Sequence, residues 1–228
     1  MNEKINYIYF TLIIISNAFS QEINLELQEE LNSILHKDQT LRELFDKNIS
    51  IERKNEILKD FSINKKDFSK EGWLIVRHQD SLNLVAIERI IETHGYPGKS
   101  MVGEPTNNTA WYVIQHSNKI EEYFSLIEQA GKSGEIKMTK VAMMQDRMLM
   151  DKGEEQIYGT QGSGRHIKNI ETGKEEMFWF IWPIKNPKNV NTLRKIVGFS
   201  TTVEENAKNM DIEYMVYSIK EINTFTQN

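Results

Sequence analysis

The sequence predicts an α+β protein that is predominantly α-helical, with a compact multi-helix core and a small β-hairpin towards the C-terminus. Apolar residues recur at three- and four-residue steps between residues 22 and 47, which is the spacing of one helix face. Two apolar arms near residues 165–170 and 177–184 flank a glycine-containing turn, which is typical of a hairpin. With 228 residues, 39% of them hydrophobic, the chain can bury a real core. We therefore predict a single globular domain over residues 21–228.

Composition narrows the classes of partner. Charged residues make up 27% of the chain and the net charge is -5, which argues against nucleic-acid binding because such proteins usually carry a basic face. There is no cysteine, so disulfides and thiolate-zinc sites are excluded. We expect the partner to be a polar small molecule or a cell-envelope component.

The first 20 residues have the pattern of a signal peptide. Lys4 supplies a positive charge, residues 7–16 are apolar, and Ala18-Phe19-Ser20 is a small-x-small cleavage pattern. The apolar segment is too short to span a bilayer as a helix. We predict a signal peptide over residues 1–20 and a periplasmic or secreted mature protein. A short uncleaved N-terminal anchor is the alternative, and it is the only membrane contact that we expect.

The helix expected over residues 22–47 carries charge on its apolar stripe. Asp38 lies at the centre of the stripe and Arg42 lies beside it. Buried charges are costly unless they are paired, and the four-residue spacing allows these two to pair. Either they form an exposed ion pair at a frayed edge, or Asp38-Gln39 and Arg42 line a polar cavity.

A short helix near residues 51–60 and a mobile connection are expected next. The following helix is predicted to begin at Asp80, whose side chain would cap it, and to end at Gly95. Asn83 lies one turn into this helix at the edge of its apolar stripe. Asn83 therefore is expected to reach the same cavity as Asp38.

Residues 106–116 read as a buried helix, because residues 110–114 are apolar all round. Gln115 and His116 stand at its inner end. A buried histidine is either a satisfied structural group or, beside a carboxylate, a general acid or base. No His-x-x-x-His or His-Glu-x-x-His spacing occurs, so we predict no metal site and no cofactor.

The stretch from Val141 to Gln161 follows a helix over residues 121–130 that Gly131 is expected to close. It begins as a methionine-rich helix that carries Asp146 and Arg147 and stops at Gly153. Methionines at this spacing are interpreted as core packing and not as a cofactor site. A polar turn follows, with the sequence Gln156-Ile157-Tyr158-Gly159-Thr160-Gln161.

The C-terminal part is predicted to hold the hairpin and two short helices. The hairpin arms flank the turn Glu171-Thr172-Gly173-Lys174, and Pro183 ends the second arm or places it at an edge. Residues 189–198 and 202–210 are expected to be helices split near Gly198. The tail from Asp211 is expected to form a last strand.

Several short motifs together resemble an uncharacterised bacterial family, a domain of unknown function found in secreted and cytoplasmic forms. The motifs are Asp38-Gln39-Thr40-Leu41-Arg42, Asp80 to Asn83, Gly95-Tyr96-Pro97, Gln115-His116, Asp146-Arg147 and Gln156 to Gln161. The segment Arg194 to Gly198 also resembles the closing helix of that family, and the resemblance covers about residues 25–200. It implies a shared polar site and no particular reaction.

The first functional hypothesis is an enzyme, a hydrolase or lyase that works without a tightly held metal. His116 would move the proton, and Asp38, Asp80 or Asp146 would orient it. Arg42 and Arg147 would hold an anionic group. The substrate would be positioned by amide and hydroxyl side chains: Gln39, Asn83, Gln115, Gln156, Tyr158, Thr160 and Gln161.

Two other hypotheses stay open. The amide-rich set suits a non-catalytic binding module for a polar small molecule, a sugar or a peptide end. The same polar residues could also serve only to hold helix ends together. If there is a functional site, the polar turn at residues 156–161 is expected to complete it, on a foundation of Asp38, Arg42 and His116.

Overall fold

A computed structural model describes residues 22–168 and 173–225. The predicted signal peptide at residues 1–20 lies outside these residues, as do Glu171 and Thr172 of the expected hairpin turn. The described chain forms ten α-helices, one short 3-10 helix and one two-stranded antiparallel hairpin. The predicted fold class, mostly helical with a small hairpin towards the C-terminus, is confirmed.

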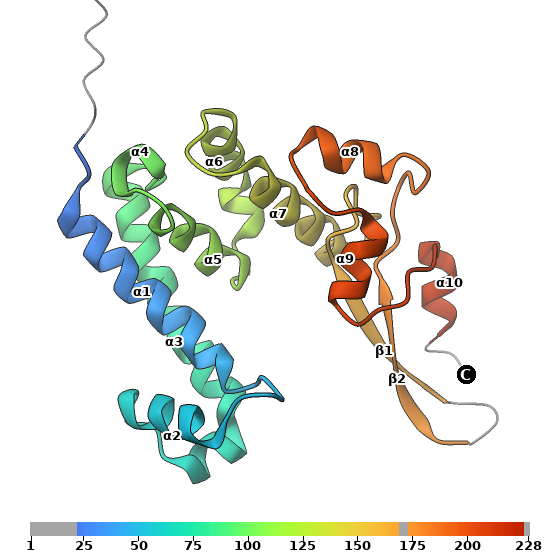
Figure 1. The fold of residues 1–228 in the computed structure, drawn as a ribbon, viewed down its shortest axis with the longest axis horizontal. Coiled ribbons are helices and arrows are strands. Elements are labelled where there is room, and N and C mark those ends of the chain that lie inside the picture. The colour runs from blue at the N-terminus through green and yellow to red at the C-terminus, as the bar shows by residue number, and fades with distance from the viewer. Residues whose placement is uncertain (1–21, 169–172, 226–228) are drawn as a thin grey trace, which may run out of the picture.

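The N-terminal part is entirely helical (Figure 1). Its elements are α1 (Leu25–Glu43), α2 (Ile51–Asp60), α3 (Lys65–His94), α4 (Lys99–Val102), η1 (Thr106–Asn108), α5 (Thr109–Gln115) and α6 (Ile120–Lys132). The apolar faces of α1, α3 and α5 meet in the largest core cluster, with Leu31, Ile87 and Ile114 fully buried. This packing brings residues from three distant parts of the sequence to one place.

Helices α1 and α3 run antiparallel, and two ion pairs between them show their register. Arg42, near the end of α1, pairs with Asp80 in the middle of α3. Glu30, near the beginning of α1, pairs with Arg89 further along α3. The turn of α1 that carries Asp38 therefore lies opposite the turn of α3 that carries Asp80 and Asn83.

The third helix begins much earlier than predicted. Asn64 caps α3 by accepting a hydrogen bond from the backbone N–H of Lys66, and Glu71 has a non-helical φ of -134° that kinks the helix without ending it. The prediction that Asp80 caps a helix is wrong, and so is the mobile connection before it. The charged residues around position 70 face solvent on one side of α3, so the apolar stripe is too weak there to show from the sequence.

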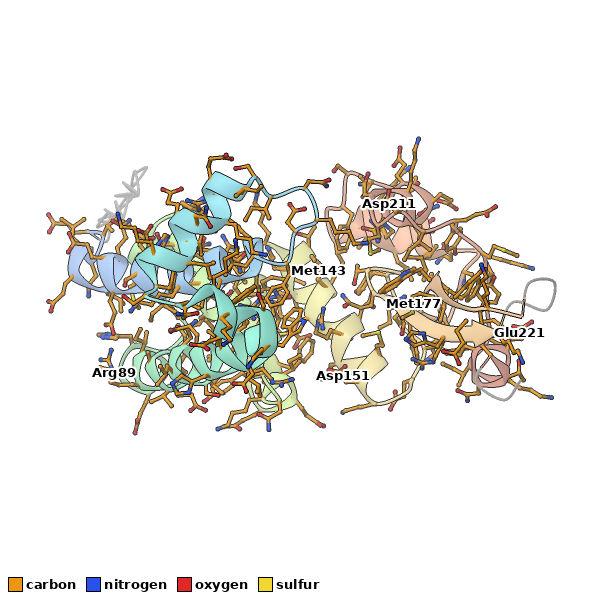
Figure 2. All side chains as sticks on the ribbon, turned by 90° about the horizontal axis from the view of Figure 1, so that it is seen from below. Arg89, Met143, Asp151, Met177, Asp211 and Glu221 are labelled. Carbon is orange, nitrogen blue, oxygen red and sulfur yellow. The ribbon has the colours of Figure 1, made fainter. Side chains whose placement is uncertain are left out.

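Helix α7 (Met138–Asp151) connects the N-terminal helices to the C-terminal part. Figure 2 shows α7, on which Met143 and Asp151 are labelled, between these two parts. The predicted end near Gly153 is confirmed, since Gly153 has a φ of 71° just after the helix. Gly131 does not close α6 as predicted. It is buried inside that helix, where a Cβ atom would lie 2.5 Å from Cγ2 of Val141, so α6 and α7 need the bare backbone to pack this closely.

The C-terminal part contains the hairpin of β1 (Gly162–Lys168) and β2 (Glu175–Ile181). Gly162 pairs with Ile181 and Lys168 pairs with Glu175. The second strand stops before Pro183, as predicted. Two short helices follow as predicted, α8 (Val190–Ile196) and α9 (Val203–Asn209).

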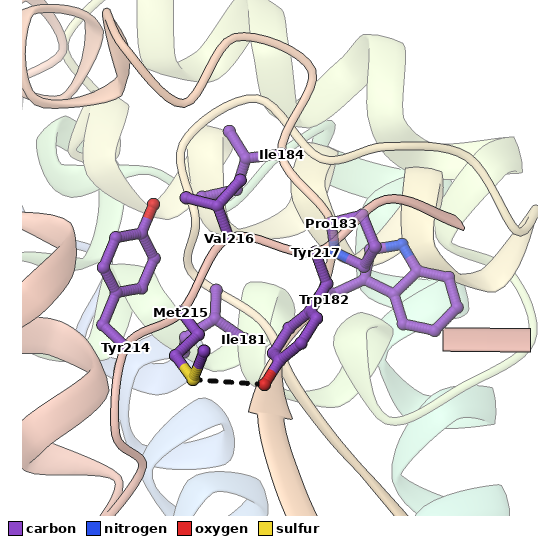
Figure 3. A pocket seen from close by; sticks show the side chains of 8 residues that line it. All are labelled: Ile181, Trp182, Pro183, Ile184, Tyr214, Met215, Val216 and Tyr217. Atoms are coloured by element: carbon purple, nitrogen blue, oxygen red, sulfur yellow. Dashed lines mark hydrogen bonds between the residues drawn. The ribbon is translucent and has the colours of Figure 1, made fainter. Parts of the chain in front are cut away.

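The tail does not form the predicted last strand. Residues 214–217 run beside residues 181–184 and enclose an apolar slot, where the Tyr217 hydroxyl contacts Sδ of Met215 at 3.4 Å (Figure 3). Tyr214 packs on the cluster that contains Ile184 and Tyr217 packs on the hairpin aromatics, whereas Met215 and Val216 are exposed, and the described sheet has only two strands. The chain then forms α10 (Ile219–Thr224), whose beginning is fixed by a reciprocal capping box between Ser218 and Glu221.

No helix in the described ranges has the length and apolar character needed to cross a membrane. The prediction of one domain over residues 21–228 stays a prediction.

Candidate functional site

Asp38 and His116 meet where α1 faces the end of α5. Nδ1 of His116 lies 3.3 Å from Oδ1 of Asp38. The carboxylate is completely buried, whereas the His116 side chain keeps 21% of its surface exposed. His116 is the residue that follows the last turn of α5, so its ring stands at the surface end of a helix whose other residues are mostly core. The predicted pairing of a buried carboxylate with a partly open imidazole is therefore present in the structure.

The environment of Asp38 keeps its carboxyl group ionised at neutral pH. Burial alone would raise the pKa, but the hydrogen bond and the charge of His116, the charge of Arg42 and the amide of Gln39 together lower it below its usual value. An ionised carboxylate only accepts hydrogen bonds. Nδ1 of a neutral His116 must therefore carry the proton, which leaves Nε2 with a free electron pair.

Arg42 holds this arrangement together. Its Nη1 donates to the backbone carbonyl of Asp38 at 2.7 Å and lies 3.3 Å from the Asp38 carboxylate. Its Nη2 lies 2.9 Å from both carboxylate oxygens of Asp80. The predicted pair between Asp38 and Arg42 is present, and Asp80 is a second partner. With its donors directed at two carboxylates, Arg42 is a positioning residue here and is not free to hold an anionic substrate as predicted.

Two amide side chains contact the pair, and a third lies buried on the facing helix α3. Nε2 of Gln39 donates to Oδ2 of Asp38 at 2.6 Å, and Nε2 of Gln115 approaches Nε2 of His116 at 3.4 Å. Asn83 is buried on α3, and its Oδ1 accepts a hydrogen bond from Gln79 at 2.8 Å. Nδ2 of Asn83 has no hydrogen-bond partner among the described residues. A buried donor without a partner costs about 1–3 kcal/mol, so the Nδ2 group of Asn83 is an unsatisfied donor on α3.

His116 opens into a cleft of about 210 Å³. The cleft is lined by Arg77, Asp80, Ser81, Leu84, His116, Ser117 and Asn118. Sequence reasoning missed Arg77, Ser117 and Asn118. Arg77 lies one turn before Asp80 on α3, so a correct helix boundary would have placed it on the same face, while Ser117 and Asn118 follow directly after the predicted Gln115-His116 motif.

The spacing of Asp38, Asp80 and His116 would also suit a metal ion. One ligand atom from each lies within 4.8 Å of the others. The guanidinium of Arg42 already contacts both carboxylates, however, and supplies the positive charge that an ion would bring. A divalent cation would have to displace or repel Arg42, so the residues present fit an internal cation better than a bound one.

Asp146 belongs to a different cluster. Its carboxylate accepts hydrogen bonds from the backbone N–H groups of Ile157, Tyr158 and Thr160 and from the Thr160 hydroxyl, at 2.8–3.2 Å. Burial raises the pKa of Asp146, and the N–H donors oppose that rise only in part. Asp146 thus fixes the polar turn after α7, and no hydrogen bond or ion pair in the described chain joins it to His116.

The remaining polar residues of that turn also bind backbone groups. Nε2 of Gln156 donates to the carbonyls of Gln161 and Trp182, and its Oε1 accepts from the N–H of Gln161. Gln161 donates to the carbonyl of Met143 and to the Thr160 hydroxyl. The buried Arg194 donates to the carbonyl of Tyr158. We name this cluster, made of Asp146, residues 156–161 and Arg194, the turn network.

The structure therefore divides the predicted site in two. One group lies where α1 meets the end of α5, and its members contact one another: Asp38, Arg42, His116, Gln39 and Gln115. Asn83 is buried on α3, and its hydrogen bond is with Gln79. Asp146, Gln156, Tyr158, Thr160 and Gln161 form the turn network beside the hairpin. Arg147 is half-buried on α7 and shares no hydrogen bond with either group. The expectation that the polar turn completes the His116 site is wrong. The N–H groups of the turn bind Asp146 and Gln156, and its glutamine amides bind backbone carbonyls, including those of Met143 and Trp182.

The motifs and this geometry can be compared with known proteins. The model of a family of unknown function, DUF6624, matches residues 71–218. The chain belongs to this family. The matched range of DUF6624 contains Asp80, His116 and the turn network, begins after α1, and reaches beyond residue 210, where the sequence alone suggested no counterpart. No curated protein and no solved structure matches the chain.

Proposed function

We propose that this member of DUF6624 is a hydrolase or lyase that uses His116 as its general acid and base, on a polar small molecule and without a tightly held metal. One observation carries the proposal. A buried, ionised carboxylate contacts Nδ1 of His116, while the ring itself lines an open cleft. This is the arrangement that orients an imidazole for proton transfer.

The roles of the residues follow from their contacts. Asp38 fixes the tautomer of His116 and stabilises the imidazolium that forms when the ring accepts a proton. Nε2 takes that proton from a water molecule or from the substrate, and returns it to the leaving group. Gln115, 3.4 Å from Nε2, gives way to the substrate or donates to it. Arg42 keeps Asp38 and Asp80 in place.

A covalent serine route receives no support from the same cleft. The Ser81 hydroxyl donates to the carbonyl of Arg77, and the Ser117 hydroxyl donates to the carbonyl of Ile114. Neither hydroxyl hydrogen-bonds to His116 among the described residues. Since a serine nucleophile needs a base within hydrogen-bond reach, direct attack by water or proton abstraction from the substrate fits better.

The experiment is a substrate search followed by substitution. Sugars, amino acids, nucleotides and cell-wall fragments are first tested for a thermal shift, and each compound that stabilises the protein is then incubated and examined for product. With a substrate in hand, we expect His116→Ala to lower kcat by about 100-fold or more, the usual contribution of acid–base catalysis. We expect Asp38→Asn to lower it by a smaller factor and to change the pH profile.

The matched control is His78→Ala, because His78 is an exposed histidine on α3 outside the cleft. It should leave kcat and KM unchanged. Turnover at the wild-type rate by His116→Ala, with the fold intact by circular dichroism, would rule out the proposed role of His116.

A second function, a binding module for a neutral polar ligand such as a sugar, is favoured by a different cleft of about 430 Å³. Its lining is mainly amide, hydroxyl and aromatic groups: Asn32, Leu35, His36, Gln39, Thr40, Pro105, Asn108 and Tyr112. Such groups suit several neutral hydrogen bonds and stacking. Recovery of a stabilising compound unchanged after long incubation supports binding, whereas recovery of a product supports catalysis.

The proposed location follows from the N-terminal sequence. Residues 1–20 would act as a signal peptide that delivers the protein to the periplasm or the exterior, where cell-envelope fragments are available. N-terminal sequencing of the protein purified from its native host should begin at Gln21. A first residue of Met1 would show that the segment is retained.

A further inference from the structure

The His116 cleft has a neighbour with which it shares a wall. A second cleft, also about 210 Å³, adjoins the first at the turn formed by Ser117 and Asn118, since both residues line both clefts. The second cleft is completed by Ile120, Glu121, Met148, Asp151 and Lys152. Together the two clefts offer a path across the end of α5, with His116 on one side of the turn.

Each cleft contains one charge without a counter-ion. In the first cleft Asp80 pairs with Arg42, which it shares with the buried Asp38, while Arg77 makes no ion pair in the described part of the chain. In the second cleft Lys152 pairs with Glu121 at 2.7 Å, while Asp151 makes no ion pair with any described residue. The charged groups without an ion pair are therefore the Arg77 guanidinium in the cleft of His116 and the Asp151 carboxylate in the second cleft.

The backbone strengthens the negative end. Asp151 is the last residue of α7, a helix of 14 residues. The C-terminal end of a helix carries a partial negative charge that favours cations. Both clefts also have an apolar wall, Leu84 in the first and Met148 in the second. A ligand that satisfies the whole path needs an anionic end, a cationic end and a body that is partly apolar.

We propose that the substrate of the His116 site is a dipolar, peptide-like molecule, with a carboxylate bound by Arg77 and an ammonium group bound near Asp151. The inference rests on the function proposed above and adds the substrate class. Asn118, which lines both clefts, would hydrogen-bond the body of the ligand between its two ends. His116 then faces the part of the ligand nearest its carboxylate.

The test uses four forms of one tripeptide, Ala-Ala-Ala: with both ends free, N-acetylated, C-amidated, and with both ends blocked. Binding is measured by calorimetry with the His116→Ala protein, so that no ligand is consumed. We expect the free tripeptide to bind more tightly than each singly blocked form by about fivefold, the size of one exposed ion pair. The doubly blocked form should bind most weakly.

Two variants assign the ends. Arg77→Gln should abolish the preference for the free carboxylate and keep the preference for the free amine, and Asp151→Asn should do the reverse. The matched controls are Lys70→Gln, an exposed charge on α3, and Asp60→Asn, the last residue of α2. Both controls should keep both preferences.

The inference is overturned if the free tripeptide does not bind, if all four forms bind equally, or if Arg77→Gln and Asp151→Asn leave the preferences intact. None of these results touches the role of His116. Failure of the proposed function would show instead as unchanged turnover of a known substrate by His116→Ala, so the two failures are distinguishable.

Discussion

Asp38 is the central residue of the candidate site, because its carboxylate is fully buried and ionised and contacts His116, Arg42 and Gln39. The sequence could predict it, since a carboxylate in the middle of an apolar helix stripe requires a partner. It could also predict Arg42, four residues later. It could not predict that Asp80 would complete the ion pair, because the register of α1 on α3 depends on contacts across the core.

We expect Asp38→Asn to lower the free energy of unfolding by about 2 kcal/mol at neutral pH, because it removes one partner of a buried charge cluster. The loss is moderate because Arg42 still pairs with Asp80. The pKa of Asp38 is lowered in the folded state. The stabilisation that Asp38 contributes is therefore present above its ordinary pKa of 3.8, which applies to the unfolded chain. It is lost as the pH falls through the lower pKa of the folded state. Urea unfolding of both proteins between pH 7 and about pH 2 measures this. A stability difference that grows on acidification would contradict the assignment.

Arg42 is expected to act as the internal cation of the cluster. Arg42→Gln removes the guanidinium from between Asp38 and Asp80 and leaves three metal-ligating groups close together. We therefore expect the variant to bind Zn²⁺ or Mn²⁺ at least tenfold more tightly than the wild-type protein, by calorimetry. Arg53→Gln, which removes an arginine from the α1–α2 contact with Glu43, is the control. Equal affinity of Arg42→Gln and wild type would show that Arg42 does not occupy the cation position.

Among the elements, helices with clean stripes and end signals were predictable and the others were not. Residues 51–60 and the helices near residues 190 and 203 were predicted closely. Helix α3 was not, because its first turns are polar and its kink at Glu71 breaks the periodicity. The tail after Asp211 has a strand-like sequence because many of its apolar residues are aromatic or β-branched. Tyr214 and Tyr217 pack as single side chains on the clusters around the hairpin, however, and Met215 and Val216 are exposed.

Asp146 determines the conformation of the segment after α7. Asp146→Ala would leave three backbone N–H groups and one hydroxyl without their acceptor. We expect a loss of about 3 kcal/mol in the free energy of unfolding. The two Thr160 donors are buried and cost about 1–3 kcal/mol each when unsatisfied, whereas the N–H groups of Ile157 and Tyr158 are only part-buried and can bind water. The control is Asp151→Ala on the same helix, which should cost less than about 0.5 kcal/mol. Chemical denaturation gives both values, and equal stability of the two variants would refute a structural role for Asp146.

The contact of α6 with α7 depends on Gly131. In Gly131→Ala the new methyl group would meet Cγ2 of Val141 at 2.5 Å and Sδ of Met138 at 2.8 Å. Overpacking of this kind costs about 1–3 kcal/mol and outweighs the gain of about 1 kcal/mol in helix propensity. We expect a lower melting temperature for Gly131→Ala. In the Val141→Ala background, Gly131→Ala should lower the melting temperature by less than it does in the wild-type background. An equal decrease in both backgrounds would contradict this contact.

At the scale of the whole molecule, the proposed catalytic residues and the polar residues of the turn network lie in different parts of the described chain. The N-terminal helices gather Asp38, His116 and their cleft, whereas the C-terminal part uses equally polar residues to hold a turn against the hairpin. The sequence showed both groups but could not show that they stand apart, because the packing of α7 between them is a property of the folded chain (Figure 2). Polar motifs alone did not distinguish a site from a scaffold.

The most direct test of the role of His116 needs no substrate. Two-bond ¹H–¹⁵N spectra of the histidine side chains at neutral pH report which ring nitrogen carries the proton, and His116→Ala assigns the signal. The contact of Nδ1 with the ionised Asp38 predicts the tautomer protonated on Nδ1, with a free Nε2, and a loss of that preference in Asp38→Asn. A wild-type His116 protonated on Nε2 alone would contradict the proposed acid–base site.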